Sequence, residues 1–144
     1  MSSDLQWLLL RNSNAFLVKR VPEGPILSKE PGNLTNLHSF KYSGLANEKT
    51  IVVKDTESGI QLLARKKGAS PRAVQPAFTT TTIRPRSGAR RAAGVTAKLA
   101  KRGYRPDLRA AALARVSALI EAKKEKKAAP PRKARGKKAK AASA

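Results

Sequence analysis

The sequence contains no cysteine, a single histidine and only nine acidic residues. Without cysteine, disulfide bridges, iron–sulfur clusters and thiolate zinc sites are excluded. A serine–histidine–acid triad would have to use His38, and no nucleophile-elbow sequence surrounds that residue. The few carboxylates are widely spread, and neither a glycine-rich phosphate loop nor a metal-ligand cluster is present. The sequence therefore predicts neither an enzyme nor a protein that uses a cofactor or a small-molecule substrate.

Long hydrophobic runs are absent as well. Apolar segments such as Trp7–Leu10 are far too short to cross a membrane or to form the core of a signal peptide. The larger apolar side chains lie mostly before residue 65, so we expect one domain with a core of modest size. These features predict a soluble intracellular protein that has no membrane partner.

Acidic residues are almost missing from the second half of the chain. Of the 31 basic and nine acidic residues, seven and six lie in residues 1–64, which leaves 24 and three in residues 65–144. The two halves therefore carry net charges of +1 and +21. A compact domain as basic as the second half would repel itself, whereas a polyanion would bind it with release of counterions. We expect a folded head at residues 1–64, a nucleic-acid-binding arm at 65–122 and a tail at 123–144.

The head is expected to contain a short helix and antiparallel β-hairpins. Its first apolar residues recur at helical spacing, which predicts a helix over about residues 4–11, with a buried strand as the alternative. β-forming residues predict strands at 16–21 and 37–42, and the proline- and glycine-rich stretch at 22–36 predicts a loop between them. Residues 50–54 and 60–64 flank a short polar loop that ends at Gly59, and this pattern predicts a hairpin.

The arm is expected to be an extended basic segment followed by two helices, which makes the fold class α+β. Residues 65–72 are typical of a basic loop, and residues 78–83 are expected to be extended, either as an edge strand or along RNA. One helix is predicted over residues 89–102, ending at Gly103. Another is predicted to begin at Pro106 and Asp107 and to carry an apolar stripe that includes Arg109.

The tail differs from both preceding segments in composition. Residues 123–144 contain ten basic residues and one acid, but no aromatic residue and no Leu, Ile or Val. Such a segment buries too little surface to offset its loss of conformational entropy. We therefore expect this Lys/Ala-rich tail to be disordered until it is bound.

The basic residues of the arm are the candidate RNA-binding site. A solvated charged face normally mixes both signs, and a membrane-binding helix needs bulkier apolar residues than Ala92, Val95 and Leu99, so nucleic acid is favoured. We expect Tyr104 to stack on a base or sugar. The alternative is that Tyr104 packs onto the head while Asp107 caps the second helix. The predicted RNA-binding residues are Arg65, Lys66, Lys67, Arg72, Arg84, Arg86, Arg90, Arg91, Lys98, Lys101, Arg102, Tyr104, Arg105, Arg109 and Arg115.

Several stretches resemble the eukaryote-specific large-subunit ribosomal protein family numbered twenty-eight. They are QWLLLRNSNAFLVKR, NLTNLHSFKYSGL, TTTTIRPRSGARR and KRGYRPDLRAAALARVSALI, which occur in this order within about residues 5–122. The resemblance implies a mixed α+β head with helices that lie on RNA. It also implies a structural protein of the eukaryotic large ribosomal subunit that contacts large-subunit rRNA and neighbouring ribosomal proteins. Assembly in the nucleolus and residence on cytoplasmic ribosomes would follow.

Two other functions stay open from the sequence. The Lys-Ala-Pro tail would suit a chromatin-associated basic protein, although the arginine content of residues 65–109 favours irregular RNA, which arginine recognises by bidentate and stacking contacts. A ribosome-assembly factor with the same head is the other alternative. Sedimentation with mature subunits, with pre-ribosomes or with chromatin would distinguish the three.

Overall fold

The structure, a computed structural model, describes residues 2–70, 73–101 and 103–124, and confirms the α+β class. The predicted disordered tail lies outside the described residues from residue 125 onward. In the part of the chain that is described, no helix is long and apolar enough to span a bilayer. The elements in chain order are α1 Ser3–Leu10, β1 Leu17–Val18, β2 Leu27–Ser28, η1 Phe40–Tyr42, β3 Ile51–Thr56, β4 Gly59–Arg65, β5 Phe78–Ile83, α2 Ala89–Lys101, η2 Pro106–Leu108 and α3 Arg109–Lys123.

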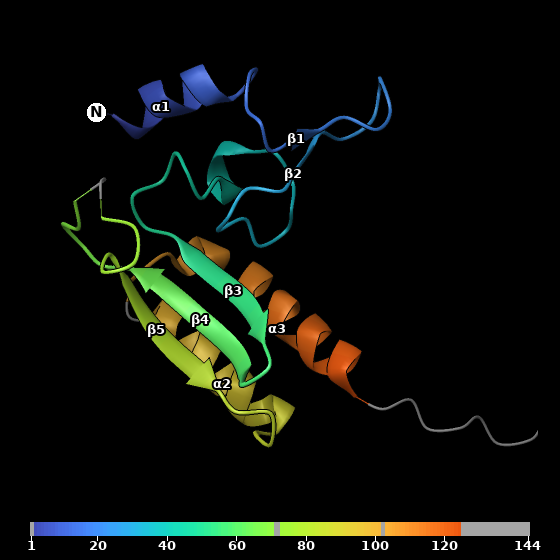
Figure 1. The fold of residues 1–144 in the computed structure, drawn as a ribbon, viewed down its shortest axis with the longest axis vertical. Helices are drawn as coiled ribbons and strands as arrows, with labels where there is room; N and C mark the ends of the chain where they lie inside the picture. Colours follow the sequence, from blue (N-terminus) through green and yellow to red (C-terminus); the bar gives the residue numbers. More distant parts are fainter. Residues whose placement is uncertain (1, 71–72, 102, 125–144) are drawn as a thin grey trace, which may run out of the picture.

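A three-stranded antiparallel sheet in the order β3-β4-β5 is the centre of the molecule (Figure 1). The predicted hairpin is confirmed, with Thr56 paired to Gly59 and Ile51 paired to Ala64. Gly59 has a φ of +129°, and a Cβ there would lie 2.1 Å from the carbonyl oxygen of Ile83, so only glycine fits this turn. The extended segment at 78–83 is confirmed as an edge strand along β4.

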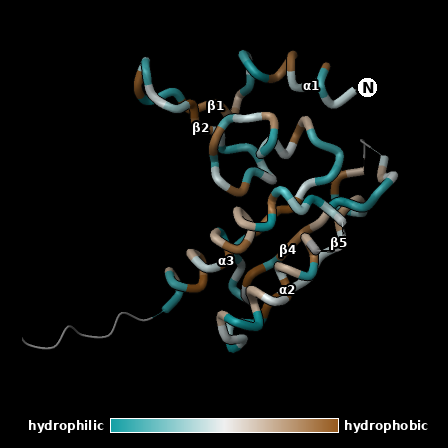
Figure 2. Tube along the Cα trace, turned by 180° about the vertical axis from the view of Figure 1, so that it is seen from behind, coloured by the Kyte–Doolittle hydropathy of each residue, from teal (hydrophilic) through white to brown (hydrophobic). Residues whose placement is uncertain are grey.

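Both long helices cover one face of the sheet, as Figures 1 and 2 show from opposite sides. The predicted helices are confirmed, the second of them beginning as the 3-10 turn η2 before α3. Small residues at the helix surfaces, Ala92 in α2 and Ala112 in α3, are fully buried and let the helices approach the strands closely. Apolar residues of the sheet and the helices form two clusters, one with Ile60, Leu62, Ile83, Ala92 and Val116, and one with Leu34, Ile51, Leu108 and Ala112.

These clusters cross the boundary predicted at residue 64. Ile60 and Leu62 lie before it, whereas Ile83 and Val116, which share their cluster, lie after it. Each half holds only part of each cluster, and the division of the chain at residue 64 stays a prediction. The charge distribution does not show this sharing, because the arm's apolar residues are mostly small or thinly spaced and yet supply three of the five residues of one cluster and two of the four of the other.

The N-terminal segment lies beyond the end of the sheet where β3 begins (Figure 1). The predicted helix near residue 4 is confirmed as α1, but the predicted strand at 16–21 is reduced to the two residues of β1. Its partner β2 lies inside the stretch predicted to be a loop. The predicted strand at 37–42 is wrong, because residues 40–42 form the 3-10 turn η1. The Asn47 amide donates hydrogen bonds to the carbonyl oxygens of Phe40 (2.7 Å) and Ser43 (2.8 Å), which favours a turn over a ladder.

Candidate nucleic-acid interface

Most of the basic side chains that the structure describes in the second half have no acidic partner among the described residues. The ion pairs within that part of the chain join Arg105 to Asp107, Lys123 to Asp55 and Lys124 to Glu121. Eight of the predicted RNA-binding residues are exposed and outside these pairs. They are Lys66, Lys67, Arg84, Arg86, Arg90, Arg91, Lys98 and Arg109.

One group of basic residues surrounds a hollow that we name the Lys98 hollow. It has a volume of about 480 Å³, and its basic lining comes from Arg65, Lys66, Lys67 and Lys98. Its other lining residues are Ala64, Thr79, Thr81, Val95, Leu99 and Tyr104. The sheet and α2 thus bring together basic residues that are more than 30 positions apart in the sequence. The hollow combines cations, hydroxyl donors and an apolar floor, a combination suited to a phosphate and its sugar.

A second group surrounds the first turn of α2, at a hollow that we name the Arg84 hollow. It has a volume of about 340 Å³, and Arg84 and Arg86 line it from the loop between β5 and α2. Lys123 and Lys124, at the end of α3, complete its basic rim. The sequence placed these two lysines in the tail, but α3 extends to Lys123, whose ammonium donates to the Thr56 carbonyl oxygen (3.0 Å). The apolar stripe that continues through Leu119 and Ile120 is the signal that could have found them.

The beginning of α2 carries positive charge where a helix favours negative charge. Arg90 and Arg91 are exposed in its first turn, and that turn holds no acidic residue. Free backbone N–H groups and the helix dipole make this end electropositive, so each arginine costs stability unless an anion lies nearby. An anion in the neighbouring Arg84 hollow would relieve this repulsion.

Two further predicted residues, both in α3, lie apart from the two hollows. Arg109 is exposed in the first turn of α3 and Arg115 is half-buried two turns later, and neither lines a hollow. Arg72, Arg102 and the side chain of Lys101 lie outside the described residues.

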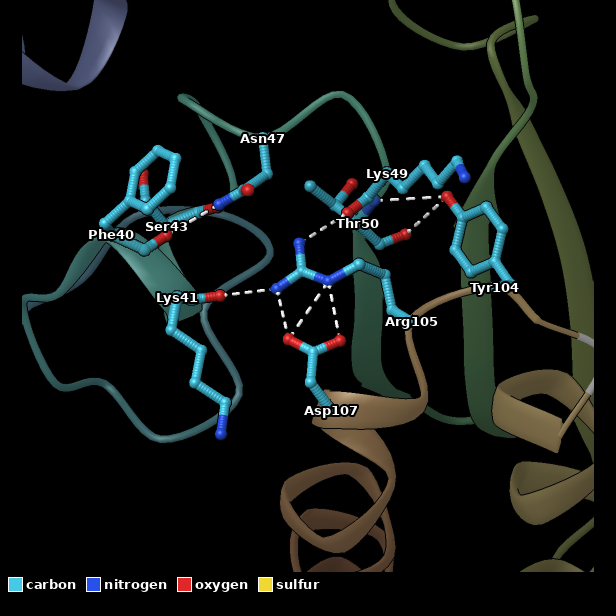
Figure 3. Close-up of polar contacts among 9 residues, drawn as sticks. All are labelled: Phe40, Lys41, Ser43, Asn47, Lys49, Thr50, Tyr104, Arg105 and Asp107. Atoms are coloured by element: carbon cyan, nitrogen blue, oxygen red, sulfur yellow. Dashed lines mark hydrogen bonds and ion pairs between the residues drawn. The ribbon is translucent and has the colours of Figure 1, made fainter. Parts of the chain in front are cut away.

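Tyr104 lies in the short connector between α2 and η2 and points into the protein (Figure 3). Its hydroxyl accepts a hydrogen bond from the Thr50 N–H (3.1 Å). The same hydroxyl lies 2.5 Å from the carbonyl oxygen of Arg65 and 3.2 Å from that of Thr50, either of which can accept its proton. Burial raises the pKa of Tyr104 above its ordinary value of 10.0, although these hydrogen bonds and nearby arginines partly oppose the rise. The ring also packs against the cluster that contains Ile51.

Arg105 is held even more firmly within the protein (Figure 3). Its guanidinium donates to both carboxylate oxygens of Asp107 and to the carbonyl oxygens of Lys41 (2.7 Å) and Lys49 (3.0 Å). The side chain is only 15% exposed, and its backbone takes the left-handed conformation, with φ of +96°. A non-glycine residue holds such a conformation only when its surroundings fix it. The hydrogen bonds from Arg105 hold the pKa of Asp107 below its ordinary value of 3.8.

These contacts favour the alternative in which the connector packs internally. That Tyr104 and Arg105 contact RNA stays a prediction, and in the structure the polar groups of both side chains are bonded to residues 41–65 and to Asp107. The two residues instead join the connector to the N-terminal part of the chain, and we call them the connector lock.

The described residues include no group of three or more His, Asp or Glu side chains placed to hold a metal ion. His38 lies against Trp7, with ring centroids 4.8 Å apart, and its Nε2 is 2.8 Å from the carbonyl oxygen of Arg11. This arrangement holds a loop beside α1.

Comparison with known proteins gives consistent results over most of the chain. The model of the ribosomal L28e protein family matches residues 5–122. "Large ribosomal subunit protein eL28" of Dictyostelium discoideum is 39% identical over 137 residues, which cover 94% of this chain and 98% of the relative. The protein of the same name from Schizosaccharomyces pombe is 30% identical over 88% of this chain and 96% of its own length. That from Caenorhabditis elegans is 36% identical over 58% of this chain and 64% of its own length.

Proposed function

Because the chain belongs to the ribosomal L28e protein family, we propose that it is a structural component of the large ribosomal subunit whose basic surface binds and stabilises large-subunit rRNA. The family is one of structural ribosomal proteins and not of enzymes. The partners are then rRNA and neighbouring ribosomal proteins. Such a protein acts on cytoplasmic ribosomes, and we propose that it joins the subunit in the nucleolus.

The observation that carries the proposal is the set of unpaired cations around α2. Arg84, Arg86, Arg90, Arg91 and Lys98 are exposed on this helix and on the loop before it, without an acidic partner among the described residues. Lysine and arginine that replace condensed counterions supply most of the affinity of a protein for a nucleic acid. The two hollows are concave regions of this surface, in which cations from several elements can surround a phosphate.

The two hollows would serve different parts of an RNA strand. In the Arg84 hollow, arginines and the first turn of α2 offer N–H donors, which suits the bidentate binding of phosphate oxygens. In the Lys98 hollow, Thr79 and Thr81 offer hydroxyls beside the lysines, which suits a phosphate together with a ribose 2′-hydroxyl. The one aromatic residue that lines either hollow is Tyr104, which is half-buried and bonded within the protein, so we expect recognition of RNA shape more than of sequence.

A salt titration of RNA binding tests the proposal. The variant Arg90→Gln, Arg91→Gln removes two exposed charges of α2, and Lys19→Gln, Arg20→Gln removes two exposed charges near β1 as the matched control. Binding of the full chain to a large-subunit rRNA fragment is measured across salt concentrations. The α2 variant should reduce the slope of log K against log salt by about 1.4–1.8, while the control should leave it nearly unchanged. Equal losses in the two variants would contradict an RNA surface centred on α2.

Sucrose-gradient sedimentation of a cell lysate tests whether the protein belongs to the mature large subunit. A component of the mature subunit is found in 60S-type particles and polysomes. An assembly factor would be restricted to pre-ribosomes, and a chromatin protein would sediment with chromatin. Either of the last two results would reject the proposed structural role in the ribosome.

A further inference from the structure

Helix α1 exposes its more hydrophobic face to solvent. Leu5, Leu8 and Leu9 are 49%, 57% and 65% exposed, and no residue of the helix is fully buried. The half-buried positions are Ser3, Gln6, Trp7 and Leu10, which recur at helical spacing and form the inward face. A surface helix normally buries its most apolar stripe. In α1, three leucines face outward, while the inward face combines Trp7 and Leu10 with a serine and a glutamine.

Contacts of the inward face fix α1 in this orientation. The Trp7 ring lies 4.8 Å from the His38 ring and 5.9 Å from the Phe40 ring, measured between centroids. The Ser2 hydroxyl accepts the Asp4 N–H (3.3 Å) and so caps the first turn. Figure 2 shows α1 at one end of the molecule, away from the sheet and the long helices, with hydrophobic residues along it. The leucines are therefore presented on the periphery.

From this arrangement we propose that the outward face of α1, formed by Leu5, Leu8 and Leu9, is a docking surface for an apolar patch of a neighbouring protein in the large subunit. The inference rests on the proposed ribosomal function, but it concerns a surface other than the RNA surface around α2. It assigns α1 to protein–protein contact and the basic surface to rRNA.

Charge decides between protein and RNA as the partner. The exposed residues of α1 and the turn after it include one acid, Asp4, and one base, Arg11, so this surface has no excess of cations for phosphate. The basic residues without partners lie in the second half of the chain instead. A nearly neutral apolar face fits an apolar protein surface, where burial of leucine is the main source of affinity.

The tail of the chain is not suited to cover the three leucines. Residues 125–144 contain no Leu, Ile, Val or aromatic residue, so they cannot form an apolar partner for three leucines. Three leucines on an eight-residue helix are also a small area for a stable dimer, which normally buries about 800 Å² on each partner. A second copy of the chain is therefore disfavoured, and the contact gains its persistence from the RNA anchorage of the same protein.

Site-specific photo-crosslinking in purified large subunits tests the proposal. The full chain carries p-benzoylphenylalanine at Leu8 in one variant and at Arg90 in the other, and each replaces the natural protein in cells before the subunits are isolated. We expect the Leu8 probe to form an adduct with another protein of the subunit, and the Arg90 probe to form one with rRNA. An adduct of the Leu8 probe with rRNA or with a second copy, or no adduct, would overturn the proposal. If the Arg90 probe nevertheless yields an rRNA adduct, the proposed function stands while the α1 proposal fails.

Salt washing of the subunits gives an independent measurement. Apolar contacts persist in salt whereas phosphate contacts weaken, so loss of the α1 contact should be most evident at high salt. We expect Leu8→Gln, Leu9→Gln to be retained roughly tenfold less than the natural chain after such a wash. The matched control, Val21→Gln, Val74→Gln, replaces two valines that are 61% and 76% exposed elsewhere. Equal retention of the two variants would count against a docking role for α1.

Discussion

Replacing Tyr104 with phenylalanine separates the two roles that the connector between α2 and α3 could have. Phenylalanine keeps the aromatic ring, so stacking on an RNA base would be preserved. It removes the hydroxyl, which accepts from the Thr50 N–H at 3.1 Å and donates to a carbonyl oxygen of Arg65 or Thr50. A loss of stability with unchanged RNA affinity per folded molecule is therefore expected only if the connector lock is internal.

The size of the loss follows from the groups left behind. Thr50 is only 4% exposed, and its N–H loses the phenolic oxygen as acceptor. The Thr50 carbonyl still accepts the Arg65 N–H at 3.2 Å, so the main cost is one buried, unsatisfied donor together with one lost hydrogen bond. Such a combination costs about 2 kcal/mol. With an m-value of about 2 kcal/mol/M in urea, the unfolding midpoint would fall by about 1 M.

The assay is urea unfolding of the full chain, followed by circular dichroism, with RNA binding measured in parallel. Tyr42→Phe is the matched control, because Tyr42 is half-buried and its hydroxyl has no hydrogen bond to any residue that the structure describes. We expect the control to shift the midpoint by far less than Tyr104→Phe. Equal midpoints for the two variants would refute the lock, and a weaker RNA complex without a stability change would return Tyr104 to the RNA surface.

Three further predictions concern the shared core, the tail and the ion pair of Asp107. A fragment of residues 1–64 should show no cooperative urea transition, because it lacks Ile83, Ala92 and Val116 from the core; a sharp transition would contradict the shared core. Deletion of residues 125–144 should lower the salt slope of RNA binding and leave the unfolding midpoint unchanged, and an unchanged slope would show that the tail does not touch RNA. Stability supplied by Asp107 is present above its ordinary pKa of 3.8 and is lost as the pH falls below that value, because Arg105 lowers the pKa in the folded state. Asp107→Asn should therefore unfold with a shallower pH dependence in this acid range, and an identical profile would contradict the Arg105 contact.

Local sequence patterns predicted most elements of the fold, but they did not predict how the elements meet. The hairpin around Gly59, the strand at 78–83 and the helices after Ser87 depend on neighbouring residues, so they can be derived from turn signals and periodicity. The failure at 37–42 came from Asn47, whose amide bonds to residues several positions earlier. The sharing of the core across residue 64 was not predicted, because it depends on alanines such as Ala92 and Ala112. Composition counts these as weakly hydrophobic, yet in the fold they are fully buried against strands.

The candidate site was predicted only in part for a related reason. Charge indicated which half of the chain carries the basic residues, but it could not show that β4, β5 and α2 gather Arg65, Thr79 and Lys98 around one hollow. Such an arrangement depends on strand register and on the crossing from β5 to α2, neither of which is encoded in a local pattern. The outward leucines of α1 show a different limit of sequence analysis. Helical periodicity identified the face that they share, but not whether this face points toward the protein or toward solvent.

Scarce acidic residues offer a way to distinguish the basic residues that serve the fold from those that serve a partner. Among the described residues after 64, the acids are Asp107 and Glu121, and each holds a base, Arg105 or Lys124. Arg105 also donates to two backbone carbonyl oxygens, so most of its hydrogen-bonding capacity is used within the fold. Arg90 and Arg91 lie at the electropositive start of α2, whose first turn has no acidic residue. Positive charge at this position lowers the stability of the protein alone. We therefore propose that, in a chain this basic, an arginine beside one of the few carboxylates serves the fold, whereas arginines clustered away from them bind a polyanion.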